Sequence, residues 1–246
     1  MTAVRRVASE ASAAWHGFLR RRTAVVFTFL FPVLIVLIFG VLVQAQPTGG
    51  GLFARPPAYY IPGYLAVVVL FTPLSRVSST VARHRAGNRF EKLATTPLQP
   101  AEWLLAQTLV NAALVGAATV LVLALLALLT DAAFVIAPAL VPAVGLGAAL
   151  FCGVGALLCR LADSRDGAIA ASNGIGLPLL FLSETFVPPE LLPAWFRPVV
   201  SLSPLTYFSR ASRAALSGGA DASLVTLGVL AVVGFALGAY ALPWRE

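Results

Sequence analysis

Hydrophobic residues run along this chain in six long stretches that contain no charged side chain. The stretches extend over 23–46, 56–75, 103–130, 132–159, 167–183 and 222–244. A helix rises 1.5 Å per residue, so about 20 apolar residues cross the hydrocarbon core of a bilayer. An ionised side chain at the bilayer centre costs about 2.5–3.5 kcal/mol, so charges mark the ends of such helices. The pattern predicts six transmembrane helices, of which the fifth is marginal in length.

The composition leads to the same class of protein. Hydrophobic residues make up 59% of the chain, charged residues only 11%, and the mean hydropathy is +0.89. These values lie well outside those of soluble globular domains. We therefore expect an all-α polytopic membrane protein that forms a single transmembrane domain over residues 1–246.

Residues 1–22 follow a different pattern from the apolar stretches. Apolar side chains recur at helical spacing, and the charged ones fall elsewhere: the apolar set is Val4, Val7, Ala8, Ala11, Trp15, Phe18 and Leu19. A secretory signal peptide would continue into an apolar run of 7–15 residues, whereas the run after residue 22 has about 20. We expect an amphipathic helix in the inner membrane interface, with Trp15 at the level of the lipid headgroups.

The basic residues predict the orientation. With the N-terminus inside, 13 of the 17 Lys and Arg residues, Arg76 among them, fall on the cytoplasmic side, and Arg55, Arg197, Arg210 and Arg213 fall outside. Cytoplasmic loops retain Lys and Arg, so both termini are expected in the cytoplasm and the protein in the cell (cytoplasmic) membrane. A basic face beside anionic lipid explains the net charge of +7 without a nucleic-acid partner.

The sequence offers little for catalysis. A Walker A loop ends in Gly-Lys-Ser/Thr, but the only lysine, Lys92, stands between Glu91 and Leu93. No His, Cys or carboxylate cluster has metal-ligand spacing, and the two histidines, His16 and His84, are expected to be solvated or lipid-facing. Cys152 and Cys159 lie on one predicted helix, where they cannot form a disulfide with each other. Any energy from ATP must come from another chain.

A charged cytoplasmic loop over 83–102, RHRAGNRFEKLATTPLQPAE, separates the second and third apolar stretches. It holds four of the 17 Lys and Arg residues. Asn88 and Glu91 have the spacing of a capping box, which predicts a short helix that exposes Phe90 and Leu93. Thr96 and the following proline would end this helix and start the next. This order of a short helix, a turn and a second helix favours a docking element for a soluble partner. An ordinary positive-inside loop is the alternative.

An outer insert over 184–221 is rich in proline and aromatic residues. The prolines are Pro188, Pro189, Pro193, Pro198 and Pro204, and the aromatics include Phe186, Trp195, Phe196, Tyr207 and Phe208. Prolines prevent one continuous helix, and aromatic side chains favour the membrane interface. We expect short helices that dip into the outer leaflet; an ordinary extracellular loop is the alternative.

Polar and small residues inside the stretches have two interpretations each. Asn111, Ser172 and Asn173 would line a substrate pathway or form hydrogen bonds between helices. Glu184, at the end of the fifth stretch, is expected to be an interfacial carboxylate rather than a buried one that faces the pathway. Small residues at every fourth position allow close helix approach, which we expect within one chain: Gly234 and Gly238, and Gly145, Ala149 and Gly153.

Two segments carry a resemblance to a known family. The run 87–98, GNRFEKLATTPL, resembles the cytoplasmic segment of ABC-2 type permeases, the membrane subunits of prokaryotic ABC exporters of the daunorubicin-resistance type. A second group resembles the segment between the last two spans of that family: 178–183, Phe186, Pro188, Leu192, Pro193, Trp195, 203–207 and Arg213. The chain departs from the usual pattern at Glu184 and Ser203.

The resemblance implies a division of labour between chains. The coupling helix, which would lie in a groove of a separate ATPase subunit, corresponds to Arg89, Phe90, Glu91, Lys92, Leu93, Thr95, Thr96, Pro97 and Leu98. ATP and Mg would be bound by that ATPase, and this chain would carry no cofactor of its own. Two permease chains, identical or homologous, would pair in the lipid membrane. The outer insert would be a re-entrant pair of helices that closes the pathway and contains Pro188, Pro193, Trp195, Pro204, Tyr207 and Arg213.

Two other functions stay open. A secondary transporter or channel would work without ATP, although such proteins usually carry intramembrane charges for ion coupling, and the apolar stretches have none away from their ends. A non-transporting anchor or assembly subunit is the other. Apolar spans suit a hydrophobic or amphiphilic cargo such as a drug, lipid or lipid-linked product, while small ions and peptides are not excluded.

Overall fold

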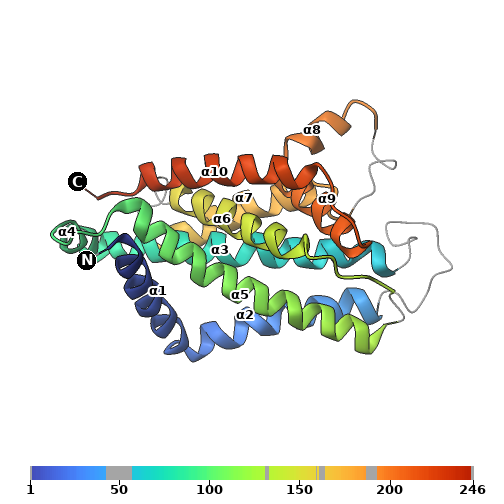
Figure 1. The fold of residues 1–246 in the computed structure, drawn as a ribbon, viewed down its shortest axis with the longest axis horizontal. Helices are drawn as coiled ribbons and strands as arrows, with labels where there is room; N and C mark the ends of the chain where they lie inside the picture. Colours follow the sequence, from blue (N-terminus) through green and yellow to red (C-terminus); the bar gives the residue numbers. More distant parts are fainter. Residues whose placement is uncertain are drawn as a thin grey trace.

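The computed structural model describes residues 2–42, 57–130, 133–158, 160, 164–186 and 193–244, and these are almost entirely helical. The helices are α1 (Ala3–Leu19), α2 (Arg22–Ile35), continued by the π-helix η1 (Val36–Leu42), the 3₁₀ turn η3 (Pro57–Tyr60), α3 (Ile61–Ala86), α4 (Arg89–Ala94), α5 (Pro100–Leu129), α6 (Leu140–Leu158), α7 (Arg165–Phe181), α8 (Arg197–Leu202), α9 (Pro204–Leu216) and α10 (Ser223–Ala241). The long helices form a bundle, with α4 and both termini at one end and α8 and α9 at the other (Figure 1).

Five helices in the described part of the chain are long and apolar enough to cross a membrane. They extend over Arg22–Gly40, Ala58–Ala86, Pro100–Leu129, Leu140–Leu158 and Ser223–Ala241. The protein is therefore a multi-pass membrane protein. The fifth predicted span corresponds to α7, which has 17 residues and is not among these five, although it lies in the bundle beside α3. Its span stays a prediction.

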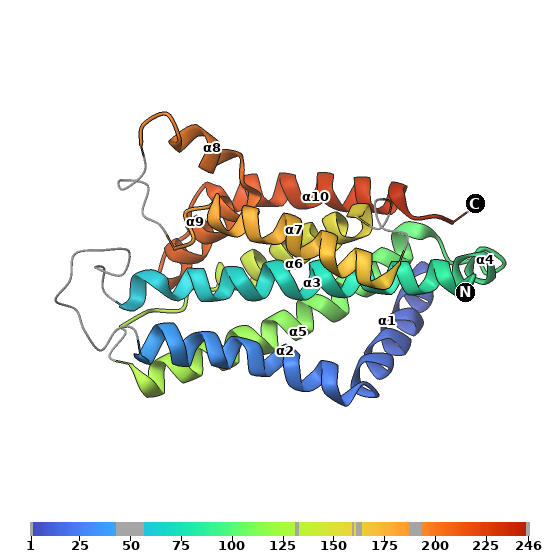
Figure 2. The ribbon, with the colours of Figure 1, turned by 180° about the vertical axis from the view of Figure 1, so that it is seen from behind.

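Helix α3 is the centre of the bundle. It packs against α5, α6, α7 and α9, and Figure 2 shows it running through the middle of the molecule. Its side chains from Tyr64 to Leu74 include many that are almost fully buried, and they pack with Phe151 of α6 and Phe208 of α9. Its first part, from Ile61 to Leu74, is hydrophobic on all sides, as expected for a helix that other helices surround.

Helix α3 also extends beyond the apolar stretch that predicted it. The stretch ended at residue 75, and Arg76 was expected on the cytoplasmic side beyond it, but α3 continues without a break to Ala86. At 1.5 Å per residue, its 26 residues give a length of about 39 Å, more than the roughly 30 Å of hydrocarbon. Arg76 therefore lies within a transmembrane helix, ten residues before its end at Ala86, and its guanidinium stacks on Phe18 of α1, 4.4 Å from the ring centroid.

Helices α6 and α10 approach closely along their small residues. A Cβ atom added at Gly153 would overlap the backbone carbonyl of Gly234, and one added at Gly238 would lie 2.6 Å from the carbonyl oxygen of Gly153. The predicted close approach within one chain is confirmed for these three glycines. Gly145 is different, because an added Cβ would meet no atom within 4 Å.

Helix α1 is amphipathic as predicted and lies against the inner part of α5. Ala11, Trp15 and Phe18 pack with Val110 and Leu114 of α5. An ion pair adds to this contact: the Arg6 Nε donates to Glu102 Oε2 at 2.9 Å and its Nη2 to Oε1 at 2.5 Å. Not all of the predicted apolar stripe is covered, since Val4 and Leu19, at the two ends of the helix, remain exposed. The headgroup-level position of Trp15 stays a prediction.

The fourth predicted span begins later than the sequence indicated. The apolar stretch starts at residue 132, but α6 begins at Leu140. Because a proline disfavours helical backbone in the residue before it, Pro138 holds the preceding segment extended. This segment bonds to the end of α9, where Val135 N donates to Leu216 O at 3.0 Å and Ala137 N to Ala215 O at 2.8 Å.

Candidate functional site

The short helix α4 lies at the end of the bundle that carries both termini, directly after α3 (Figure 1). The predicted helix exists, but the predicted capping box of Asn88 and Glu91 is wrong. Asn88 adopts the left-handed conformation, with φ 49° and ψ 33°, and its side chain forms no capping hydrogen bond. Asparagine tolerates this conformation better than most residues, so Asn88 reverses the chain between α3 and α4 instead of capping a helix.

The end of α4 agrees with the prediction, whereas the start of α5 differs from it. Thr96 does not begin the next helix; its hydroxyl donates to the carbonyl of Leu93 at 2.6 Å and so closes the end of α4. Helix α5 begins three residues after Pro97, with Pro100 in its first turn. There the Gln99 N–H donates to Glu102 Oε2 at 3.0 Å. A capping box therefore exists in this loop, but it lies at Gln99 and Glu102 rather than at Asn88 and Glu91. Helix α5 starts at Pro100, the second proline of the loop, rather than at Pro97.

One face of α4 is anchored in an aromatic cluster, which we define as His84, Phe90, Trp103 and Trp244. The Phe90 ring lies 5.3 Å from His84 of α3, 5.5 Å from Trp103 of α5 and 5.5 Å from Trp244 after α10. His84 and Trp103 are 5.6 Å apart. Edge-to-face pairs at these separations contribute about 0.5–1.5 kcal/mol each beyond the burial of their area.

The aromatic cluster corrects two expectations. Phe90 was expected to be exposed for a partner but is only 3% exposed, and His84 was expected to be solvated or lipid-facing but is 8% exposed. Leu93 and Leu98 are half-buried against the same cluster. In the sequence, Trp103 and Trp244 only marked the ends of two apolar stretches, and nothing in the pattern placed them beside Phe90.

The opposite face of α4 and the turn after it are exposed. We define the α4 surface by its exposed side chains, which are Arg89, Glu91, Lys92, Thr95, Thr96 and Pro97. Both signs of charge occur within one helical turn, at Glu91 and Lys92. The candidate coupling residues are thus divided between the α4 surface and the anchor formed by Phe90, Leu93 and Leu98.

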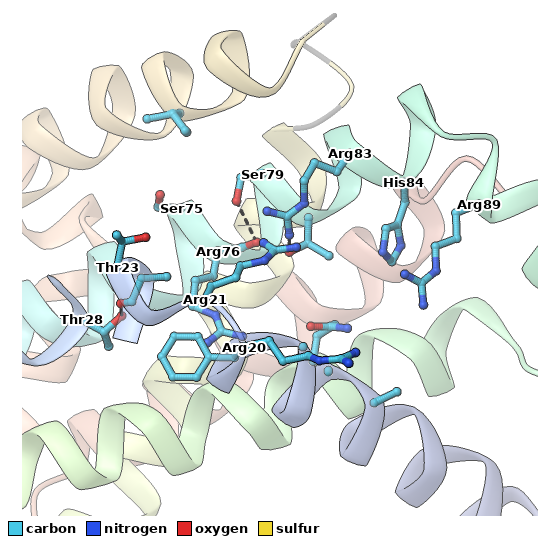
Figure 3. Close-up of a pocket in the computed structure, with 18 of the residues that line it drawn as sticks. Arg20, Arg21, Thr23, Thr28, Ser75, Arg76, Ser79, Arg83, His84 and Arg89 are labelled. Atoms are coloured by element: carbon cyan, nitrogen blue, oxygen red, sulfur yellow. Dashed lines mark hydrogen bonds between the residues drawn. The ribbon is translucent and has the colours of Figure 1, made fainter. Parts of the chain in front are cut away.

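A basic cavity of about 850 Å³ lies beside the turn between α1 and α2. Six arginines line it: Arg20, Arg21, Arg22, Arg76, Arg83 and Arg89. Figure 3 shows Arg20 and Arg21 of that turn and Arg76 and Arg83 of α3 around the same space. Among the described lining residues, Glu10 is the one carboxylate. Burial raises the pKa of Glu10, although the positive charge of Arg89 opposes this shift.

An apolar cavity of about 890 Å³ lies between α2, α3 and α7. Its lining is mostly aromatic and aliphatic, with Phe27, Phe31, Phe39, Phe71, Phe181 and Phe186 as the rings. The two cavities adjoin, since Ala24, Thr28, Ser75 and Arg76 line both. The sequence did not predict either cavity, because their walls come from helices that are distant along the chain.

The three polar residues that were proposed to line a substrate pathway lie in different environments. Asn173 lines the apolar cavity. Ser172 instead faces α3, where its hydroxyl lies 2.8 Å from that of Ser78, so the interhelical hydrogen bond accounts for it. Asn111 is fully buried, lines neither cavity, and donates from Nδ2 to the Gln107 carbonyl of its own helix at 2.8 Å.

Glu184 was expected at the interface, and this is wrong: the residue is only 6% exposed. Its carboxylate accepts two hydrogen bonds from Arg210 of α9, one of them 2.8 Å from Nε to Oε2. The carbonyl of Glu184 also accepts from Arg213 Nη2 at 3.2 Å. The ion pair raises the pKa of Arg210. Glu184 therefore joins the end of α7 to α9 through this ion pair.

The described part of the outer insert consists of two short helices, as the prolines predicted. Pro198 and Pro204 stand in the first turns of α8 and α9. Helix α9 packs against α3, α6 and α10, and Arg213 stacks on Tyr59 at 4.5 Å. Tyr207 is half-buried, whereas Trp195 is 75% exposed and Pro193 is exposed. Pro188, Pro189 and Leu192, like Arg55 and Cys159, lie outside the described residues.

Within the described residues, no group of three His, Cys, Asp or Glu side chains is arranged to hold a metal ion. Cys152 is a free, buried thiol on α6.

Comparison with known proteins gives one result. Residues 10–217, well over half of the chain, match the model of a family described as ABC-2 type transporter. The matched region includes α4, the residues of both cavities and the outer insert as far as the end of α9. No curated protein matches the chain.

Proposed function

The chain belongs to the ABC-2 type transporter family, and we propose that it is the membrane-spanning permease subunit of an ATP-driven exporter. A separate ATPase subunit would bind ATP and Mg and would dock on the α4 surface. Two such permease chains, identical or homologous, would form the pathway in the cytoplasmic membrane of a prokaryote. Both termini and α4 would face the cytoplasm, and the outer insert would lie on the opposite side.

The observation that carries this proposal is the two-sided character of α4. One side is exposed and charged at the end of the bundle, which suits a soluble partner. The other side, through Phe90, is packed into an aromatic cluster built from α3, α5 and the segment after α10. A loop that only returned the chain to the membrane would need neither feature.

The aromatic cluster would transmit movement of the ATPase to the membrane helices. Packed interiors respond to displacement as rigid bodies rather than by continuous deformation. A shift of α4 would therefore carry the inner ends of α3 and α5 with it. Closure of two ATPases would switch the pathway from inward-facing to outward-facing if each docked coupling helix favoured one state by a few kcal/mol.

Helix α3 would extend this link to the outer end of the molecule. Its inner end carries His84 in the aromatic cluster, Arg76 lines both cavities, and Phe71 lines the apolar cavity. At its outer end, Tyr64 lies 6.4 Å from Phe186, and a Cβ added at Gly63 would lie 2.9 Å from the Thr185 carbonyl oxygen. One rigid helix thus touches the coupling loop, the cavities and the start of the outer insert.

The apolar cavity between α2, α3 and α7 is the proposed part of the pathway in this chain. Asn173 is the predicted pathway residue that lies in its wall. In this proposal the second permease chain would complete the cavity, and the outer insert, fixed by the Glu184–Arg210 pair, would close it towards the outside.

An ATP-independent secondary transporter is the alternative. One observation supports this alternative. Arg76 lies on a transmembrane helix, and charges inside spans are typical of ion-coupled transporters. Arg76 lies in the half of α3 that leads to α4, however, at the level of Phe18 and the turn between α1 and α2. In the proposed orientation, this places Arg76 on the cytoplasmic side of the membrane. The alternative also gives the α4 surface no function.

Replacement of Glu91 by alanine tests the coupling role. Glu91 is exposed, so the variant should fold with a stability within about 0.5 kcal/mol of the original. We expect ATP-driven transport and transport-stimulated ATP hydrolysis to fall at least about fivefold, which corresponds to the loss of about 1 kcal/mol of coupling. Transport into inverted membrane vesicles, together with ATP hydrolysis by the same vesicles, measures both.

Asp166→Ala is the matched control, because Asp166 is also an exposed carboxylate in the first turn of a helix but lies outside the α4 surface. This control should keep both activities. Full transport by the Glu91 variant would refute a coupling role for this residue.

A further inference from the structure

The basic cavity and the apolar cavity together form one amphipathic space. The basic cavity and the apolar cavity share Ala24, Thr28, Ser75 and Arg76 in their walls. The first lies beside the turn between α1 and α2, and the second lies between the membrane helices α2, α3 and α7. A ligand that fills both must have a polar part and an apolar part joined at the level of Arg76.

The charge of the basic cavity specifies the polar part. Six arginines line it against one described carboxylate, Glu10. Guanidinium groups bind phosphate and carboxylate with two parallel hydrogen bonds and are the preferred partners of such anions in partly buried sites. Arginines gathered in this number around one cavity favour an anion between them, so the polar part is anionic.

Arg76 marks the point where the two parts meet. Its guanidinium is held over the Phe18 ring at 4.4 Å, and its Nη1 atom is buried without a hydrogen-bond partner. Buried polar atoms in folded proteins are nearly always hydrogen-bonded. An unpartnered, buried guanidinium nitrogen beside a cavity is the expected arrangement when the partner is a ligand.

The lining of the apolar cavity specifies the other part. Phenylalanine rings from α2, α3 and α7 and aliphatic side chains such as Leu177 cover most of its wall, and Asn173 is one of its few polar residues. Hydrocarbon chains fit such a surface, since burial of apolar area stabilises them by about 25 cal/mol per Å². A soluble anion would leave this cavity unused.

We propose that the substrate of this permease is an anionic amphiphile. Its phosphate-bearing headgroup binds among Arg76 and the arginines of the basic cavity, and its hydrocarbon chains lie in the apolar cavity. A membrane lipid or lipid-linked product of the inner leaflet has this chemistry. The assignment of this ligand as the transported cargo rests on the proposed permease function, whereas the binding site itself does not depend on an ATPase.

Binding of fluorescent lipids to the purified full-length chain in detergent tests the site. The probes are phosphatidylglycerol, which is anionic, and phosphatidylcholine, which has the same chains but no net charge. We expect phosphatidylglycerol to bind at least tenfold more tightly, and Arg76→Gln to remove most of this difference. Arg5→Gln is the matched control, since Arg5 is an exposed arginine outside both cavities, and it should leave binding unchanged.

A second variant tests the apolar part independently of any effect of Arg76 on folding. Leu177→Trp places a larger side chain at the wall of the apolar cavity, from a position that is 47% exposed, and should weaken phosphatidylglycerol binding several-fold without unfolding the chain. Glu10→Gln should strengthen binding, because it removes the carboxylate of the basic cavity.

Three outcomes would overturn the proposal. Equal binding of both lipids would exclude anion recognition, and equal effects of Arg76→Gln and Arg5→Gln would exclude the assigned site. Competition by millimolar inorganic phosphate together with an unchanged Leu177→Trp would indicate a site for a free anion. Failure of the permease function would appear differently: lipid binding would persist, while ATP would drive no lipid transport in vesicles.

Discussion

Replacement of Phe90 by alanine is expected to detach α4 from the membrane helices. The ring is 3% exposed and contacts His84, Trp103 and Trp244. Removal of a buried phenylalanine ring costs about 3–5 kcal/mol, and α4 has only six residues, too few to remain helical alone. ATP-driven transport should therefore be lost, even if the α4 surface itself keeps all its side chains.

Hydrogen exchange measures this effect directly. The hydrogen-bonded amide groups of α4 and its end, such as those of Lys92 and Thr96, should lose their protection in Phe90→Ala, while those in the middle of α3 keep it. Glu91→Ala is the matched control on the same helix: it should keep the protection of α4 but lose coupling. Retained protection of α4 or retained transport in Phe90→Ala would show that the aromatic cluster does not anchor the helix.

The second large effect concerns the crossing of α6 and α10. A methyl group at Gly153 would overlap the backbone of Gly234, which no side-chain movement can relieve. The two helices must separate, so Gly153→Ala should lower the stability by about 1–3 kcal/mol. At Gly145 on the same helix, an added Cβ meets nothing within 4 Å, and Gly145→Ala should stabilise the helix by up to about 1 kcal/mol.

Thermal unfolding of the purified variants in detergent distinguishes the two glycines. The unfolding temperature should fall for Gly153→Ala and rise for Gly145→Ala. Opposite signs cannot come from a general effect of replacing glycine in a transmembrane helix. If both variants shifted in the same direction, the close packing of α6 on α10 would not be a determinant of stability.

The transmembrane helices could be predicted because lipid leaves the backbone no partner but itself. Five predicted apolar stretches correspond to helices that can cross a membrane, and the short helices of the insert followed from proline. The helix ends were less predictable. Arg76 does not end α3, because Phe18 and the basic cavity accommodate its charge, and Pro138 delays α6 within an apolar stretch.

Contacts between distant residues could not be predicted from a single sequence. Glu184 and Arg210 are 26 positions apart, and Arg6 and Glu102 are 96 apart. Sequence patterns give the face of a helix but not its neighbour, so Phe90 among charges was interpreted as exposed, although His84 and two tryptophans enclose it. Each cavity depends on the positions of at least three helices together, and the hydropathy pattern contains no information on that arrangement.

The corrected position of Phe90 sharpens the functional interpretation. A fully exposed coupling loop would offer contact to an ATPase but no connection to the pathway. The structure instead divides the loop between an exposed α4 surface and a buried anchor. In the proposed mechanism the α4 surface binds the partner, and the buried anchor moves α3. Arg76 and Phe71 of α3 contribute to the amphipathic space.

Purification of the tagged chain from its own host tests the central claim most directly. The chain would be extracted in mild detergent, and the co-purifying proteins identified and quantified by mass spectrometry. The account predicts a partner with a Walker A loop in an amount equal to that of the permease, and its loss when Glu91 and Lys92 are exchanged. Recovery of the chain without such a partner, under conditions in which a known ABC complex stays intact, would contradict the account.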